Sequence, residues 1–439
     1  MIGIPYPLSK LYILINEIEL SLGRRLIKLE VNKIYLGDNL ELLRQLDDNS
    51  IDSCVSDFPY NLGFMGKKWD TISNYYQWCN DRAQELFRVL KPGAFCLIFS
   101  GTRTQHRMVC AFEDAGFEIK DQIDWIYAQG FPKSYNISKG FDKQAGAKRE
   151  VIGKYQLPNG QKWNLRQDVD DSIEHAEPSF TSSGTRKLDI TAPTTDLAKQ
   201  WNGWGTALKP THEPIMLAQK PIEKNYCYNV QKWGVGGLNI DGSRIELNGE
   251  IVPINVLENW SGFGEEDSPD YKATVNNKGR YPANTIFDED AGKVLDEQSG
   301  VLKGDSPNRK PRRSNNNNFK FYAQEDNLQG IQSGGFSDVG GASRFYYCAK
   351  SSQKDRTENG QIENNHATVK PTTLMTHLIK LVTPPNGINL DICEGSGTSM
   401  KACLWLEKDG YKVNHIGFEN DVDSYETALK RQEINNIKQ

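Results

Sequence analysis

Apolar positions along this chain follow two periods, one typical of strands and one typical of helices, which alternate from Lys33 onward. Short apolar runs indicate strands, whereas apolar residues three or four positions apart indicate helices. The first part of the chain is predicted to contain strands at 34–36, 51–55, 94–99 and 117–127, with helices at 81–90 and 104–115. This alternation is typical of a parallel sheet with helices on both faces.

The regular pattern is interrupted twice. Residues 150–206 are polar and rich in Gly, Thr, Asp and Pro, and we interpret them as a mobile loop or a functional lid. Residues 242–343 show no sustained period and have the composition of an inserted, loop-rich module. Elsewhere the pattern predicts strands at 213–218, 344–347, 388–391 and 415–419, helices at 372–381 and 399–406, and a helix at the end of the chain.

The length of 439 residues predicts one large domain with an insertion, or two domains. No run of about eighteen apolar residues occurs, so we expect no membrane-spanning helix. The apolar run 11–15 is broken by Asn16 and Glu17, which favours a helical extension over a secretory signal. The eight cysteines form no C-x-x-C pair, which favours free thiols in a reducing cytoplasm over zinc, and no metal is expected.

Charge is distributed unevenly. A net charge of −5 does not by itself indicate a nucleic-acid-binding protein. Within 301–322, however, Asp305 is the single acid against six basic residues, Lys303, Arg309, Lys310, Arg312, Arg313 and Lys320. This cluster either contacts backbone phosphates or forms a solvated loop, as the neighbouring asparagine run 315–318 indicates, and both interpretations stay open.

The tetrapeptide Asp57-Phe58-Pro59-Tyr60 follows a predicted strand, and α/β sheets bind ligands at the carboxyl ends of their strands. Its residue types suit the exocyclic amino group of a nucleobase, whose lone pair is delocalised into the ring. Asp57 and a backbone carbonyl beside Pro59 can accept hydrogen bonds from this amine, and Tyr60 can stack on a base that has swung out of the double helix. On its own, such a tetrapeptide is more often an ordinary turn.

The segment 391–398 follows an apolar strand and precedes a helix, and Gly395 and Gly397 allow the backbone to approach a ligand closely. A tight strand-to-helix turn is the ordinary interpretation of this spacing. Glu419, at the end of the next strand, is placed to bind a ribose diol as in dinucleotide-binding folds. No phosphate-binding lysine follows the turn, which argues against an ATP P-loop and favours an adenosine cofactor without phosphates.

Together, in this order, the two segments resemble the two halves of a circularly permuted, β-class DNA amino-methyltransferase of the phage N6-adenine type. The run 57–70 resembles the D-P-P-Y loop of that family, and segments 129–134, 204–214 and 233–241 resemble further blocks. Segment 366–371 resembles the T-V-K-P block, and Gly37-Asp38 resembles the block near the cofactor's adenine. The resemblance covers about residues 31–435 and departs from the family at Phe58, Ile392 and Cys393, which replace Pro, Pro and Phe.

The resemblance implies an α/β fold with a Rossmann-like mixed sheet of the methyltransferase type, circularly permuted, with an inserted loop-rich target-recognition region. It divides the chain into an N-terminal extension (1–30), a catalytic half (31–241), a target-recognition region (242–343) and a cofactor-binding half (344–439). The implied cofactor is S-adenosylmethionine, and the implied partner is double-stranded DNA, in the cytoplasm of a prokaryote or from a phage. A partner restriction endonuclease and a homodimer are left open.

The residues implied to act fall into three groups. Asp57, Phe58, Pro59 and Tyr60 form the catalytic group. The cofactor group comprises Asp38, Lys370, Pro371, Asp391, Gly395, Ser396, Gly397, Thr398 and Glu419. The DNA-binding group comprises Arg309, Lys310, Arg312 and Arg313.

Asp57 at the first tetrapeptide position favours N6 of adenine as the target over N4 of cytosine. The three departures also allow a homologue that binds DNA and cofactor with weakened or lost catalysis. Methylation of RNA or of a protein amide is a third, less favoured alternative. The scattered histidines form no metal or triad spacing, and without a Pro-Cys dipeptide the covalent route to carbon 5 of cytosine is not expected.

Overall fold

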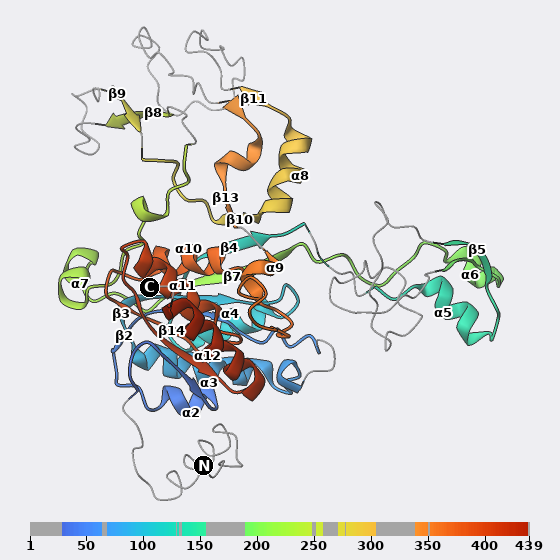
Figure 1. Ribbon diagram of the computed structural model, residues 1–439, viewed down its shortest axis with the longest axis horizontal. Helices are drawn as coiled ribbons and strands as arrows, with labels where there is room; N and C mark the ends of the chain where they lie inside the picture. The colour runs from blue at the N-terminus through green and yellow to red at the C-terminus, as the bar shows by residue number, and fades with distance from the viewer. Residues whose placement is uncertain are drawn as a thin grey trace, which may run out of the picture. The chain divides into compact units, whose positions relative to one another are not determined.

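The computed structural model describes residues 29–63, 68–128, 130, 134–154, 189–247, 252–257, 271–276, 278–303, 339–349 and 352–437. These residues form two compact units. The larger unit comprises the described residues up to Ile126 and from Glu213 onward, and the smaller unit lies between Tyr127 and His212. Each unit has its own helices and strands, labelled in Figure 1.

A nine-stranded sheet organises the larger unit. Its strand order is β1 (Lys33–Leu36), β15 (Asn414–Glu419), β14 (Ile388–Asp391), β2 (Ile51–Asp57), β3 (Leu90–Phe99), β7 (His212–Gln219), β4 (Glu118–Ile126), β10 (Thr285–Asp288) and β13 (Tyr347–Ala349). Strands β1, β15, β14, β2 and β3 pair in parallel, whereas β7 runs antiparallel to β3. The implied mixed sheet is therefore present, and the parallel pairing indicated by the alternation of elements holds for these five strands but not for β7.

Helices cover both faces of this sheet, as predicted. Along β3, Cys96 and Ile98 belong to the hydrophobic core that also contains residues of α3 (Tyr75–Val89) and α4 (Gln105–Asp114). Leu97 and Phe99 point to the opposite face because side chains alternate along a strand. Helix α10 (Thr372–Val382) packs on β2 and β3 and contacts α11 (Thr398–Lys408), which in turn contacts α12 (Val422–Ile437) (Figure 1).

Capping side chains decide where two helices near the site begin. Asn74 accepts a hydrogen bond from the backbone N–H of Gln77 at 3.2 Å, so α3 begins at Tyr75, six residues before the predicted start at 81. Asp38 caps α2 (Asn39–Leu43) by accepting from the backbone N–H groups of Leu40 and Glu41. No helix among the residues that the structure describes is long and apolar enough to cross a membrane.

Residues 242–343 contain more regular structure than the sequence predicted. Strand β10 of this range belongs to the nine-stranded sheet, where it pairs in parallel with β4 and β13, and α8 (Glu289–Ser299) follows it. Two antiparallel pairs, β8 (Val252–Leu257) with β9 (Tyr271–Asn276) and β11 (Leu302–Lys303) with β12 (Val339–Gly340), also lie here. The strand predicted at 344–347 is shifted, because Ala342–Phe345 form a 3-10 turn and β13 begins at Tyr347.

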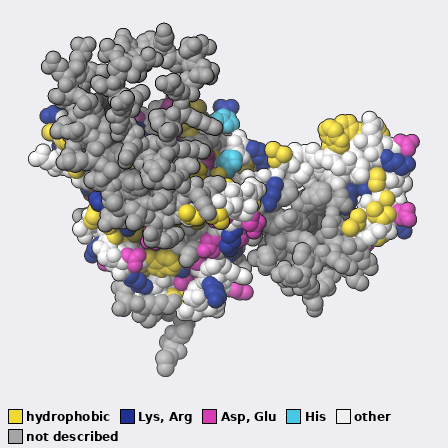
Figure 2. All heavy atoms as spheres, turned by 90° about the horizontal axis from the view of Figure 1, so that it is seen from above, with side chains coloured by type: hydrophobic (Ala, Val, Ile, Leu, Met, Phe, Trp, Pro, Cys, Tyr) yellow, Lys and Arg dark blue, Asp and Glu magenta, His cyan; other side chains and the backbone are white. Residues whose placement is uncertain are grey.

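The smaller unit contains α5 (Ile137–Gln144), β5 (Glu150–Lys154), β6 (Asp189–Ala192) and α6 (Asp196–Gln200). Strands β5 and β6 are antiparallel, so the described ends of the predicted loop 150–206 are regular, while 155–188 lie outside the described residues. The buried Asp142 carboxylate accepts from Arg149 at 2.8 Å and from the backbone N–H of Thr195 at 2.9 Å. The face of this unit seen in Figure 2 mixes hydrophobic and charged side chains.

All eight cysteines are free thiols. Cys54, Cys79, Cys96 and Cys403 are buried, whereas Cys110 and Cys227 are exposed. The expectation of free thiols is confirmed, while Cys348 in β13 and Cys393 are only partly buried.

Candidate active site

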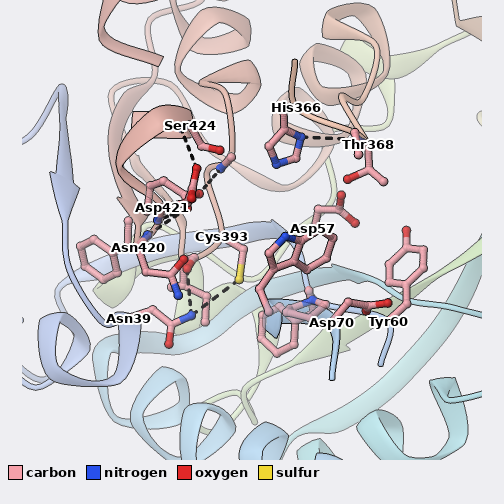
Figure 3. A pocket seen from close by; sticks show the side chains of 18 of the residues that line it. Asn39, Asp57, Tyr60, Asp70, His366, Thr368, Cys393, Asn420, Asp421 and Ser424 are labelled. Atoms are coloured by element: carbon pink, nitrogen blue, oxygen red, sulfur yellow. Dashed lines mark hydrogen bonds between the residues drawn. The ribbon is translucent and has the colours of Figure 1, made fainter. Parts of the chain in front are cut away.

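The two segments singled out by the sequence meet at one edge of the sheet. Strands β2 and β14 are parallel neighbours, with Cys54 opposite Leu390, so their carboxyl ends lie together. The Ser56 hydroxyl donates a hydrogen bond of 2.7 Å to the Asp391 carboxylate, which joins the two segments directly. Both segments line one cavity of about 680 Å³. Figure 3 shows Asp57 and Tyr60 toward one end of this cavity and Asn420 and Asp421 toward the other.

Asp57, the last residue of β2, has two carboxylate oxygens in different situations. Oδ2 accepts a hydrogen bond from Nζ of Lys370 at 2.5 Å. Oδ1 is buried and has no hydrogen-bond partner among the described residues. A buried acceptor without a partner is costly, so this oxygen is suited to accept from a ligand that enters the cavity.

Phe58 lies in the position where the resemblance expects proline. Its ring is 1% exposed and packs in the hydrophobic core, 5.4 Å from the Trp78 ring in an edge contact and 6.0 Å from the Phe112 ring. Phe58 and Pro59 both line the cavity. Because the Phe58 ring is part of the hydrophobic core, phenylalanine in place of proline adds apolar contacts beneath the cavity.

Tyr60 lines the cavity and is held by its hydroxyl group. The hydroxyl donates to Oε2 of Glu213 on β7 at 2.7 Å, and the backbone carbonyl of Tyr60 accepts from the Thr104 hydroxyl at 2.7 Å. Burial, together with the nearby carboxylates of Asp57 and Glu213, raises the pKa of Tyr60 well above its ordinary value. The side chain therefore remains a neutral phenol that donates a hydrogen bond.

Lys370 lies against Asp57 and is not among the residues that line the cavity. Its Nζ is 2.5 Å from Oδ2 of Asp57 and 3.3 Å from Oε2 of Glu213. Burial lowers the pKa of Lys370, but the two carboxylates outweigh burial, so the pKa is raised and the ammonium stays charged. Pro371 is the N-cap residue of α10 and also does not line the cavity.

The two glycines of the turn act differently. Gly395 has φ +59°, lines the cavity and donates its backbone N–H to Oε2 of Glu419 at 2.7 Å. A Cβ at this position would lie 3.2 Å from Nε2 of His366, which also lines the cavity. Gly397 has φ +85°, and a Cβ there would lie 2.9 Å from Cα of Ala428 on α12. Gly395 therefore keeps space open in the cavity, whereas Gly397 permits close packing of two helices.

Glu419, at the end of β15, contributes a carboxylate to the cavity. The carboxylate accepts from three backbone N–H groups, those of Gly395, Asn420 and Asp421, at 2.7–2.9 Å. Burial raises the pKa of Glu419 to about 7, although the backbone hydrogen bonds oppose this shift. The group can therefore change charge near neutral pH.

Three residues of the turn segment that were predicted to bind the cofactor are buried and do not line the cavity, namely Asp391, Ser396 and Thr398. Asp391 accepts from the hydroxyl groups of Ser56 and Ser399 and from the backbone N–H of Cys393. Burial and the nearby Glu394 raise the pKa of Asp391 to about 7. These side chains hold the turn in shape. Asp38, in contrast, lines the cavity as well as capping α2.

Arg431 of α12 supports the same turn from the far side. Its buried guanidinium donates to the backbone carbonyl of Ser396 and to the hydroxyl of Thr398, each at 3.0 Å, and pairs with Glu358 at 3.1 Å. Lys401 also pairs with Glu358, at 2.5 Å. A network of positive and negative side chains therefore fixes the turn, α11 and α12 together.

Sequence reasoning missed Glu213, His366 and Arg431. Glu213 lies in a block that resembled the family, but its contact with Tyr60 spans 153 positions and leaves no local signal. His366 was counted among the scattered histidines, yet it lines the cavity (Figure 3), and its Nε2 would lie 3.2 Å from a Cβ added at Gly395. Burial lowers the pKa of His366 to about 4, so its ring is neutral. The predicted DNA-binding residues Arg309, Lys310, Arg312 and Arg313 lie outside the described residues.

Comparison with known proteins places this chain in a family. The N6/N4 methyltransferase family model, described as DNA methylase, matches residues 51–430. This match covers most of the chain, and the chain belongs to this family of DNA methylases. The assignment made from the motifs is confirmed at that level.

Individual relatives match shorter segments. The chain is 24% identical over 251 residues to the Type II methyltransferase M.HindIII of Haemophilus influenzae, which covers 48% of this chain and 65% of that protein. It is 31% identical over 114 residues to the Type II methyltransferase M.HpaI of Haemophilus parainfluenzae, covering 25% and 36%. Less than two thirds of the length of each relative is therefore covered.

Among solved structures, the chain is similar to the cytosine-N4-specific PvuII DNA methyltransferase, with 12% identity and a TM-score of 0.40 over 92% of this chain and 90% of that chain. It is also similar to M1.HpyAVI in complex with SAM, with 14% identity and a TM-score of 0.36 over 91% and 98%.

Proposed function

We propose that this chain transfers a methyl group from S-adenosylmethionine to the exocyclic N6 amino group of an adenine in DNA. Membership of the DNA methylase family supports the reaction class. The observation that carries the proposal is that Asp57, with one buried oxygen lacking a described partner, shares a cavity with Gly395 and Glu419. A hydrogen-bond acceptor for the target amine and a binding surface for an adenosine cofactor therefore line the same cavity.

The lining residues fit this cofactor. Seven of them are acidic, and among those that the structure describes Arg82 is the only lysine or arginine. Such a lining suits a ligand with cationic sulfonium and ammonium groups and opposes polyphosphates. Glu419 is placed for a ribose diol, and the space that a side chain at Gly395 would fill is left open. The bound cofactor supplies an activated methyl carbon.

The chain's own residues then prepare the nucleophile. Oδ1 of Asp57 accepts a hydrogen bond from the target amine, which draws the nitrogen out of conjugation with the ring. Tyr60 stacks on the base after it leaves the duplex. With S-adenosylmethionine bound, the amino nitrogen would form a bond to the methyl carbon while the bond from that carbon to sulfur breaks with its electron pair staying on sulfur, and the nitrogen would then release one proton to water.

The order of segments supports the permuted, β-class arrangement as part of this proposal. The catalytic segment at Asp57 comes first, the range 242–343 follows as target-recognition region, and the cofactor turn comes last. In this scheme Arg309, Lys310, Arg312 and Arg313 contact the phosphates of double-stranded DNA, a salt-sensitive interaction. A partner restriction endonuclease and a homodimer belong to the same proposal, as does a phage or prokaryotic origin.

Radiolabel transfer tests the proposal. The chain is incubated with methyl-tritiated S-adenosylmethionine and unmethylated genomic DNA, and the DNA is digested to nucleosides and separated. Label in N6-methyl-2′-deoxyadenosine, abolished in Asp57→Ala and in Gly395→Arg, is the expected result. Label in N4-methyl-2′-deoxycytidine instead assigns the alternative base. Cofactor binding by calorimetry without any label supports a homologue that has lost turnover, consistent with the departures at Phe58, Ile392 and Cys393.

A further inference from the structure

We propose that Glu213 and Lys370 are positioning residues of the methyl-transfer site: Lys370 occupies one oxygen of Asp57 so that the other is left for the target amine, and Glu213 holds both Lys370 and Tyr60. This inference rests on the proposed function. It gives Lys370 a role at the target base, where the resemblance had implied a role at the cofactor.

The contacts come from three separate parts of the chain. Asp57 ends β2, Glu213 lies on β7, and Lys370 directly precedes the N-cap of α10. The Lys370 ammonium lies 2.5 Å from Asp57 and 3.3 Å from Glu213, and Glu213 accepts from the Tyr60 hydroxyl at 2.7 Å. The Lys370 side chain is 7% exposed, so these charges interact with little screening by solvent.

The arrangement decides which oxygen of Asp57 is available. Lys370 contacts Oδ2, while Oδ1 is buried and lacks a partner among the described residues. A carboxylate with both oxygens free could rotate and present either one, but the Lys370 contact fixes its orientation. Orientation of the acceptor matters because a small displacement of a reacting group lowers the rate strongly.

The second carboxylate changes the electrostatics. A lone Asp57–Lys370 pair would be neutral, and the ammonium would withdraw charge from the acceptor. With Glu213 sharing the ammonium, the three side chains carry a net negative charge beside the cavity. This charge favours the positive charge that develops on the amino nitrogen as the methyl group arrives.

Glu213 also fixes the aromatic ring that receives the base. The Tyr60 hydroxyl is tied to Glu213, and Nζ of Lys370 lies 5.4 Å from the centre of the Tyr60 ring. Rotation of the ring about its Cα–Cβ bond would break the hydroxyl contact. One carboxylate therefore couples the stacking surface to the hydrogen-bond acceptor.

Steady-state kinetics of Glu213→Gln tests the role. The amide keeps the shape of the side chain and can still accept from Tyr60, but the charge is lost. We expect kcat to fall about ten- to hundredfold, with the cofactor Kd changed less than about twofold. Tyr60→Phe removes the hydroxyl contact alone and should mainly raise KM for DNA.

The matched control is Glu223→Gln. Glu223 is a carboxylate that also pairs with a lysine, Lys232, but lies outside the cavity lining. Its substitution should leave kcat unchanged. A Glu213→Gln enzyme with the kcat of Glu223→Gln, measured per folded molecule, overturns the positioning role, because a purely structural ion pair would affect only stability.

A second readout does not depend on turnover. Lysines labelled with ¹³C at Cε are titrated by NMR, and the Lys370 signal is assigned as the one absent from Lys370→Arg. Glu213→Gln should lower the pKa of Lys370, because burial remains and one attracting carboxylate is gone. An unchanged titration overturns the coupling. Absence of methyl transfer by the unaltered chain contradicts the proposed function instead, so the two failures are distinguishable.

Discussion

The variant Gly397→Ala tests how closely the turn at 391–398 packs against α12. Gly397 precedes α11 with φ +85°, a backbone conformation that side-chain-bearing residues rarely adopt. A Cβ at this position would lie 2.9 Å from both Cα and Cβ of Ala428 on α12. The backbone of α12 must then move away, because the nearest atoms are not the end of a flexible side chain.

The expected loss of stability in Gly397→Ala has two contributions. The left-handed conformation costs an alanine about 1–2 kcal/mol. Overpacking against α12 costs about 1–3 kcal/mol more. Gly410→Ala isolates the first part, since Gly410 has φ +79° but a Cβ added there would meet no atom within 4 Å among the described residues. The difference between the two variants, about 1–3 kcal/mol, measures the close approach of the helices.

Amide hydrogen exchange detected by mass spectrometry measures the effect where it occurs. Peptides from the first turns of α11 and from α12 should exchange roughly fivefold to a hundredfold faster in Gly397→Ala than in Gly410→Ala. Exchange by local opening is the suitable measurement because a chain with two compact units need not unfold in one step. Equal exchange in the two variants would refute the reasoning from helix packing.

Two further predictions concern the same half of the site. Burial raises the pKa of Glu419 from 4.5 to about 7. The protonated carboxyl group therefore stabilises the fold at low pH, and this contribution to stability is lost as the pH rises through about 7. Cofactor affinity, which needs the ionised carboxylate, should rise from about pH 6 to about pH 8. Calorimetry should show this rise in the unaltered chain and not in Glu419→Gln; the same pH dependence in both contradicts the assignment. Arg431→Met leaves Glu358 with one cation fewer and should destabilise the packing of α11 and α12 by about 3–5 kcal/mol, measured as faster amide hydrogen exchange of both helices. Lys430→Met, on the exposed side of α12, is its control and should cost little.

Local patterns in the sequence predicted much of the element order. Strands β2 and β14 and the turn at Gly395 were found because apolar runs and glycines carry their own conformational preference. Each segment was placed after a predicted strand, and the structure brings both to one cavity. The start of α3 was missed because its first two turns are mixed in polarity and depend on the Asn74 cap.

Tertiary structure alone decided which side chains act together. The contact of Lys370 with Asp57 spans 313 positions, and it forms because the segment before α10 is brought over the end of β2. Tertiary packing also buries Asp391, Ser396 and Thr398, which the resemblance had implied to bind the cofactor, so that they do not line the cavity. Strand order and direction, including the antiparallel direction of β7, depend on how all the helices and strands pack together. No local hydrophobic pattern in the sequence specifies them.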